Sequence, residues 1–262
     1  MAVIERGPMN MKLRRAGFLV ASVLVLGGCA TTERSSAMPS VQADTTQAKP
    51  YVEPSNGSLK LSALRTSEAD YEIIYSPEAL AEKKQIVAAG VVDGWQQGPI
   101  LNSFPGGPLD YRVLMRVRIT HPLKGVKGTP SLRGNIAFIE FDQGAVIRDD
   151  SVPVEQWKIE RSPADFEKSI PTGTRVLLFG SERPPYEQSV YDPGDPLTDG
   201  AKIMAVGPQG LVLEDPGLVQ LRAERTLVGG REPLKGGRRA AWLEPKTMDQ
   251  MIDRLKKHGF SE

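Results

Sequence analysis

The acidic side chains between residues 191 and 200 are the first candidates for chemistry. Asp192, Asp195 and Asp199 alternate with Pro and Gly residues, which favour turns that can bring carboxylates together. Calcium takes several oxygen ligands, and a glycosidase needs a pair of carboxylates. The spacing is not that of an EF-hand, and no acid pair stands out. We expect a solvated turn here, with a calcium site and acid-dependent hydrolysis as alternatives.

Other catalytic signatures are missing from the sequence. It contains neither Gly-x-Ser-x-Gly nor His-Glu-x-x-His. One of the two histidines, His121, precedes a proline at the end of an apolar segment, and the other, His258, lies near residue 262. We expect an edge residue and a cation at a helix C-terminus. These patterns favour a binding protein over an enzyme and predict no cofactor.

Two basic sets are candidates for binding acidic partners. Arg112, Arg116 and Arg118 recur at even spacing, so in a β-strand they would share one face. Arg238 and Arg239 lie in a Gly-rich segment that we expect to be a mobile loop. Either set could contact an acidic protein, anionic lipid headgroups or a cell-wall polymer. A solvated face and a loop without a ligand are the commoner meaning of such patterns.

Overall charge and the tryptophans narrow the partners only a little. The formal net charge of +1 gives no reason to expect nucleic-acid binding. Trp95, Trp157 and Trp242 could line a ligand groove, but tryptophans more often pack in a core or at its rim.

The single cysteine, Cys29, has a distinctive context. Basic residues at 12, 14 and 15 precede an apolar run over residues 16–26. That run is too short to span a bilayer, which needs about 20 residues, and it is typical of the central part of a signal peptide. It ends in Leu26-Gly27-Gly28-Cys29, which resembles the lipobox of bacterial lipoproteins.

The resemblance implies an exported, lipid-anchored protein. Residues 1–28 would be a signal peptide, and Cys29 would carry diacylglycerol and a further fatty acid such as palmitate. Several acyl chains on one terminus anchor a protein stably to a membrane. Residues 29–58 are rich in Ser, Thr, Ala, Gln and Pro and have few large apolar side chains, so we expect a disordered tether. Residues 59–262 would form one globular domain outside the cytoplasm.

Periodicity predicts the elements of that domain. Ser76-Pro77 and Ser162-Pro163 are typical helix starts, and Thr247 begins a third helix with an apolar stripe. Strands are predicted at 85–95, 111–121, 135–141 and 173–179, and a hairpin at 203–214, turning at Gly207-Pro-Gln-Gly210. In the strand over 111–121, the residues expected to be buried are Tyr111, Val113, Met115, Val117 and Ile119.

Short strands without regular helix alternation favour a mainly β fold with peripheral helices (α+β), such as a small OB-like β-barrel. The segments Arg116-Val-Arg-Ile-Thr-His-Pro-Leu-Lys-Gly125 and Gly173-Thr-Arg-Val-Leu-Leu-Phe179 are similar to those of uncharacterised exported bacterial domains. That resemblance implies an OB-like barrel akin to the tissue inhibitors of metalloproteinases. The cysteines of those inhibitors are absent here, so no inhibitory activity is carried over. We expect a non-enzymatic binding module for an envelope protein or a cell-wall polymer.

Overall fold

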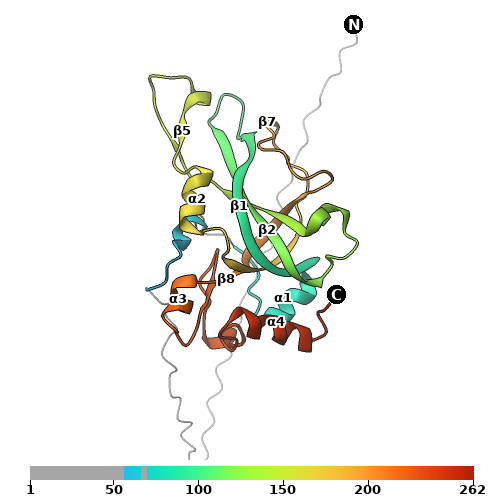
Figure 1. Cartoon of the computed structure of the whole chain (residues 1–262). Helices are drawn as coiled ribbons and strands as arrows, with labels where there is room; N and C mark the ends of the chain where they lie inside the picture. Colours follow the sequence, from blue (N-terminus) through green and yellow to red (C-terminus); the bar gives the residue numbers. More distant parts are fainter. Residues whose placement is uncertain (1–55, 66–69) are drawn as a thin grey trace, which may run out of the picture. The chain divides into compact units, whose positions relative to one another are not determined.

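The computed structural model describes residues 56–65 and 70–262, so the predicted signal peptide and most of the tether lie outside the described residues. The described chain is mainly β, with one mixed sheet and a few short helices (Figure 1). The predicted class, α+β with mostly β structure, is confirmed.

Seven strands form the main sheet. They are β1 Ile86–Asn102, β2 Leu109–Lys124, β3 Ile136–Asp142, β6 Arg175–Glu182, β7 Val190–Asp192, β8 Ile203–Glu214 and β9 Leu227–Gly229. Five of them pair in a closed series, β1 to β2, β3, β8, β6 and back to β1. Only the β3–β8 step is parallel. β7 pairs with β1 and β9 with β8, while β4 Val146–Ile147 and β5 Lys158–Ile159 form a separate two-stranded sheet.

Capping residues set the helix starts. The α-helices are α1 Pro77–Lys83, α2 Pro163–Ser169, α3 Pro216–Gln220 and α4 Met248–Lys257, and 3-10 helices cover Leu61–Ala63, Pro130–Asn135, Val154–Gln156 and Gly237–Trp242. The hydroxyls of Ser76 and Thr247 each accept a backbone N–H of the first turn, and Ser162 forms a capping box with Asp165. The three predicted helix starts are confirmed.

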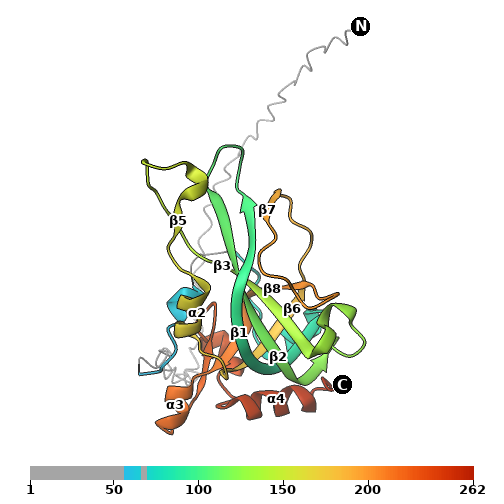
Figure 2. The ribbon, with the colours of Figure 1, turned by 45° about the horizontal axis from the view of Figure 1, so that its top comes forward.

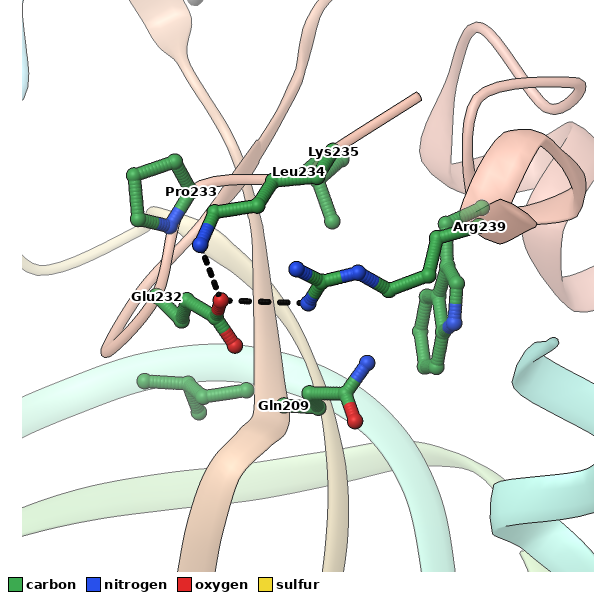
Figure 3. Close-up of a pocket in the computed structure, with 8 residues that line it drawn as sticks. Gln209, Glu232, Pro233, Leu234, Lys235 and Arg239 are labelled. Carbon is green, nitrogen blue, oxygen red and sulfur yellow. Dashed lines mark hydrogen bonds and ion pairs between the residues drawn. The ribbon is translucent and has the colours of Figure 1, made fainter. Parts of the chain in front are cut away.

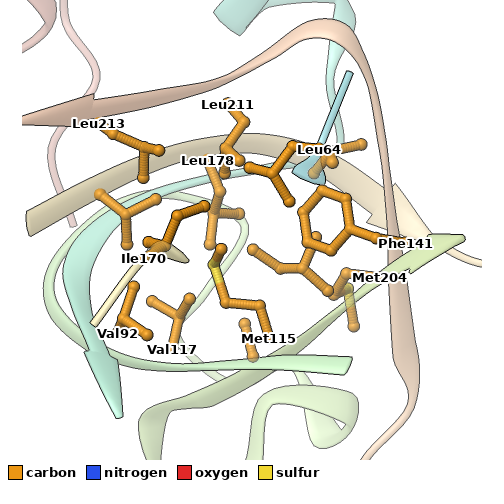
Figure 4. Close-up of a cluster of buried hydrophobic side chains, with 14 of the residues drawn as sticks. Leu64, Val92, Met115, Val117, Phe141, Ile170, Leu178, Met204, Leu211 and Leu213 are labelled. Carbon is orange, nitrogen blue, oxygen red and sulfur yellow. The ribbon is translucent and has the colours of Figure 1, made fainter. Parts of the chain in front are cut away.

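Two clusters of buried apolar side chains lie on the two faces of the sheet. The first includes Val113, Met115, Val117 and Ile119 of β2, which confirms four of the five residues predicted to be buried; Met115 and Val117 are labelled in Figure 4. Tyr111, the fifth, is only partly buried because it lies near the end of the strand. The second lies between the sheet and helices α1 and α4. Consecutive residues of β6, such as Leu177 and Leu178, belong to different clusters. Strand β6 is therefore buried on both faces.

The predicted hairpin at 203–214 is wrong. Strand β8 pairs with β6 on both sides of the segment 207–210, with Val206 opposite Gly180 and Leu211 opposite Leu178. The residues between them leave the ladder as a bulge. The Gln209 side chain fixes this bulge, because it bonds both the N–H and the C=O of Ile74 at 2.8 and 2.9 Å. Turn-forming residues thus make a bulge instead of a chain reversal.

Strand β1 is longer than predicted, since it continues past Trp95 to Asn102. The register of its pairing with β2 shifts between Val92 and Gly94 and again beyond Gln97. Gly98 permits the second irregularity, because a Cβ at that position would meet the carbonyl oxygen of Arg112 at 2.9 Å. The long β1–β2 hairpin carries residues 97–111 away from helix α4 (Figure 2). It thereby positions both surfaces considered below.

The described chain is already held to the domain at Ser58, the last residue of the expected tether. The N–H and hydroxyl of Ser58 both donate to Asp215 Oδ1 at 2.9 Å, and the N–H of Leu59 donates to Oδ2 at 3.0 Å. Burial raises the pKa of Asp215, but these hydrogen bonds outweigh it and leave the pKa lowered. Asp215 therefore fixes the point where the chain enters the domain.

Candidate functional site: an arginine cleft

A cleft of about 320 Å³ opens on the face of β2 and β3 opposite the first apolar cluster. We call it the arginine cleft. Its charged lining residues are Arg112, Glu140, Asp142, Arg183 and Arg231. Arg112 of β2 pairs in register with Asp142 of β3. Since side chains alternate along a strand, Glu140 and Asp142 share that face, while Phe141 points into the core.

Glu140 is the centre of the charged cluster. It accepts a hydrogen bond from Arg183 Nε at 2.9 Å and another from the hydroxyl of Tyr186. The Arg183 guanidinium also lies over the Tyr186 ring, 3.6 Å from its centroid. Burial raises the pKa of Tyr186, and the hydrogen bond to Glu140 raises it further. The Glu140 side chain is only 11% exposed, and Arg183 and Tyr186 provide its hydrogen bonds.

The charge of Arg112 is also balanced by carboxylates. Its guanidinium pairs with both Asp110 and Asp142. Its Nε is buried and has no hydrogen-bond partner in the described chain. Two carboxylates thus neutralise Arg112 and leave one polar atom without a bond, which is uncommon for a buried donor.

Arg231 differs from the other two arginines. One of its N–H groups donates to the Val206 carbonyl at 2.7 Å, but no carboxylate of the described residues forms an ion pair with it. Burial lowers the pKa of Arg231, and the charge of Glu140 opposes that effect. Of the three arginines that line the cleft, Arg231 is therefore the one that forms no ion pair with a carboxylate of the described residues, although the charge of Glu140 acts on it. A guanidinium presents several N–H groups in one plane, an arrangement that fits a carboxylate or phosphate.

The predicted basic face of β2 reaches the cleft at one position only. Arg112 lines the cleft, whereas Arg116 and Arg118 both approach Asp93 of β1, at 2.9 and 3.5 Å. Spacing along β2 could not predict this neutralisation, because Asp93 lies on a different strand. The three arginines therefore do not form one free basic surface.

The segment around Arg238 and Arg239 is not the mobile loop that we expected (Figure 3). Glu232 Oε1 lies 2.7 Å from Lys235 Nζ and 3.1 Å from an Arg239 guanidinium nitrogen. Leu234 is buried, and a 3-10 helix begins at Gly237. Of the two predicted arginines, Arg238 is exposed and Arg239 is bound to this internal cluster. These contacts fix the segment, because they satisfy its charges within the protein.

A small cavity adjoins the Glu232 cluster. It measures about 10 Å³, which suits a single water molecule. Glu232 Oε2 is buried there without a partner in the described chain. The cavity beside Arg239 is too small for a ligand larger than water.

The three predicted calcium ligands each form a hydrogen bond or an ion pair with another residue of the protein. Asp192 Oδ1 accepts from the N–H of Gly194, and Asp195 Oδ2 accepts from the N–H of Gln97, each at 2.8 Å. Asp199 is 97% exposed and lies 3.3 Å from Arg133. Within residues 56–65 and 70–262, no three His, Cys, Asp or Glu side chains are grouped as a metal site requires. The geometry lends no support to the calcium and acid-catalysis alternatives.

The tryptophans lie in separate places. Trp95 packs against Phe166 in the first cluster, and Trp242 packs against Phe179 in the second. Trp157 lines a different groove, described below. Among the histidines, His258 caps the C-terminus of α4, as predicted.

Sequence reasoning missed Glu140, Arg183, Tyr186 and Arg231. One signal was present, because Glu140 is an acid within a predicted strand that is otherwise apolar, and buried acids are rare unless they are paired. Its partners Arg183 and Tyr186 could not be found from spacing, since both follow β6. Arg231, which lines the same cleft without pairing with Glu140, follows β9.

No family model, curated protein or solved structure matches the chain. Among the described residues, none of the helices has the length and apolar character needed to cross a membrane.

Proposed function

We propose that this chain is an exported, lipid-anchored envelope protein whose folded domain binds an anionic group in the arginine cleft without catalysing a reaction. The observation that carries the ligand class is Arg231, the half-buried guanidinium that has no carboxylate partner in the described chain. The ligand class is a carboxylate or phosphate group on an envelope protein or cell-wall polymer.

The proposal includes an OB-like barrel as the finer fold. The closed series of five paired strands supports it, as do the parallel β3–β8 step and helix α2 between β3 and β6. OB barrels bind extended ligands across strands 2 and 3 and the loops beside them. The arginine cleft lies on β2 and β3, next to the connection that follows β6. This argument is an analogy between folds and supports the location alone.

The anchor rests on the sequence around Cys29. The apolar run, the small residues at 27 and 28 and the single cysteine together resemble a lipoprotein signal. Cells expressing the full chain are labelled with an alkyne analogue of palmitate. We expect labelling and membrane association in the parent protein and loss of both in Cys29→Ser. Equal labelling of the variant would contradict lipidation at this residue.

The test of the cleft uses the full chain, purified in detergent and titrated with inorganic phosphate and with citrate at constant ionic strength. Removing the Arg231 charge eliminates charge-assisted hydrogen bonds, each worth about 1.5–3 kcal/mol, so Arg231→Gln should lower affinity about tenfold or more. Arg231→Lys keeps the charge but loses the planar fork, so its affinity should lie between the two.

Arg148→Gln is the matched control, because Arg148 is exposed, does not line the cleft and pairs with Asp150. It should bind both anions as the parent does. Thermal unfolding of each variant shows whether it is folded. Equal affinity of folded Arg231→Gln and the parent for both anions would refute an anion site at Arg231.

A further inference from the structure

A second groove, of about 500 Å³, lies on the opposite side of the β2–β3 edge from the arginine cleft. We call it the aromatic groove. One wall is formed by residues 155–160, which include the end of the β4–β5 lobe (residues 146–159), together with the start of α2, and the other by Gln97 of β1, Tyr111 of β2 and Gln143. Its volume falls within the range of ligand sites in proteins, roughly 300–1,000 Å³. The proposed function does not use this groove.

Two aromatic rings give the groove flat apolar surfaces. Trp157 lines it from the lobe and Tyr111 from β2. The Trp157 indole N–H donates to the Asp149 carbonyl at 2.9 Å, so its ring is held in place before any ligand arrives. Burial raises the pKa of Tyr111, and the nearby Tyr191 raises it further. Tyr191 is 57% exposed and adds a third aromatic side chain beside Tyr111.

Amide and hydroxyl groups stand beside these rings. Gln143 is fully buried, and its amide donates to the Arg161 carbonyl at 3.1 Å while its oxygen accepts from Gln97 at 2.8 Å. This network fixes Gln97, whose own side-chain oxygen accepts no hydrogen bond within the described chain. The Tyr111 hydroxyl likewise has no partner there. The groove thus offers a positioned acceptor and a hydroxyl that can donate or accept.

The charges of the groove argue against an anionic occupant. Glu155, Glu160 and Asp165 line it, against a single lysine, Lys158. A cationic occupant is also disfavoured, since Glu160 lies 3.5 Å from Arg161 and Asp165 accepts two hydrogen bonds from Ser162. The two remaining charged residues of the lining, Glu155 and Lys158, have opposite signs. The free polar groups are therefore mostly uncharged.

We propose that the aromatic groove binds an uncharged saccharide. A sugar ring has apolar faces that pack on aromatic rings and hydroxyls that need both donors and acceptors, and the groove supplies both kinds of contact. Trp157 stacks on one sugar face. Tyr111 and Gln97 bind its hydroxyls.

The experiment uses the full chain in a detergent without a sugar headgroup. The probes are the neutral trisaccharides chitotriose, cellotriose and maltotriose, with trigalacturonate as the acidic comparison. Binding is followed by tryptophan fluorescence and by saturation-transfer NMR on the sugar. At least one neutral trisaccharide should bind at concentrations up to about 10 mM, and more tightly than trigalacturonate.

Variants then assign the site. Trp157→Ala should lower saccharide affinity about tenfold or more, and Tyr111→Phe, which removes only the hydroxyl, about threefold to tenfold. Arg231→Gln should leave saccharide binding unchanged, which separates this groove from the arginine cleft. If Trp157→Ala does not fold, Tyr111→Phe decides the assignment.

Three results would overturn the proposal. They are no binding of any neutral trisaccharide, tighter binding of trigalacturonate, or parental affinity in folded Tyr111→Phe and Trp157→Ala.

Discussion

The arginine cleft and the aromatic groove lie on opposite faces of the same two strands. Tyr111 lines the groove and the next residue, Arg112, lines the cleft, while on the β3 side Asp142 lines the cleft and Gln143 the groove. Alternation along a strand explains this division. The comparison teaches that two adjacent strand ends can support two surfaces of unlike chemistry. One is organised by ion pairs and the other by amide hydrogen bonds.

The comparison predicts that losing the central residue of the cleft, Glu140, lowers the unfolding free energy more than losing the central residue of the groove. Glu140→Ala would leave the Arg183 guanidinium and the Tyr186 hydroxyl without their acceptor in a largely buried place. Breaking such a pair from one side costs about 3 kcal/mol of unfolding free energy. Urea unfolding of the parent and variant measures it. Glu140→Gln, which keeps an acceptor oxygen, should lose less, and a cost for Glu140→Ala below about 1 kcal/mol would contradict the central role of Glu140.

The equivalent substitution in the aromatic groove, Gln143→Ala, should lower the unfolding free energy by less. Gln143→Ala removes hydrogen bonds to the Arg161 carbonyl and from the Gln97 amide. These groups are neutral, so the expected cost is about 2 kcal/mol, including the buried polar groups left unsatisfied. The same urea unfolding measures it. If Gln143→Ala costs more than Glu140→Ala, charge pairing is not what distinguishes the two surfaces.

Some of this arrangement was predictable from the sequence and some was not. The period of two over residues 111–119 predicted the buried face of β2, and Ser-Pro pairs predicted two helix starts, because these signals are local. The bulge at 207–210 was predicted as a hairpin, because its residues are typical of turns. The hydrogen bond from the Ile74 N–H to Gln209, which holds the bulge, joins residues far apart in sequence. Glu140, Arg183 and Arg231 line one cleft only after the strands pair, so spacing carried no information about the cleft.

The two surfaces should respond to opposite ends of the pH scale. The raised pKa of Tyr186 implies stability that is complete below the unfolded value, about 10, and is lost as pH rises through the folded pKa. The N–H and hydroxyl of Ser162 lower the pKa of Asp165 beside the groove. Its contribution is present above about pH 3.9 and is lost as pH falls through the folded pKa.

Thermal unfolding across pH, with Tyr186→Phe and Asp165→Asn as matched variants, tests this difference. Tyr186→Phe should reduce the loss of stability on the alkaline side only, and Asp165→Asn the loss on the acidic side only. Unchanged profiles in both variants would show that these groups do not control the pH response.

The smallest change in unfolding free energy is expected from breaking an ion pair in the β4–β5 lobe, beside the groove. Arg148 Nε lies 2.7 Å from Asp150, and both side chains are more than two-thirds exposed, at 73% and 71%. Water and salt screen such a pair, so Arg148→Gln should change the unfolding free energy by less than about 0.5 kcal/mol. That difference should be smaller at high salt than at low salt when the urea unfolding is repeated at both. A loss above about 1 kcal/mol would mean that surface charge holds the lobe in place. The groove would then depend on ion pairs as the cleft does, and the contrast between the two surfaces would be wrong.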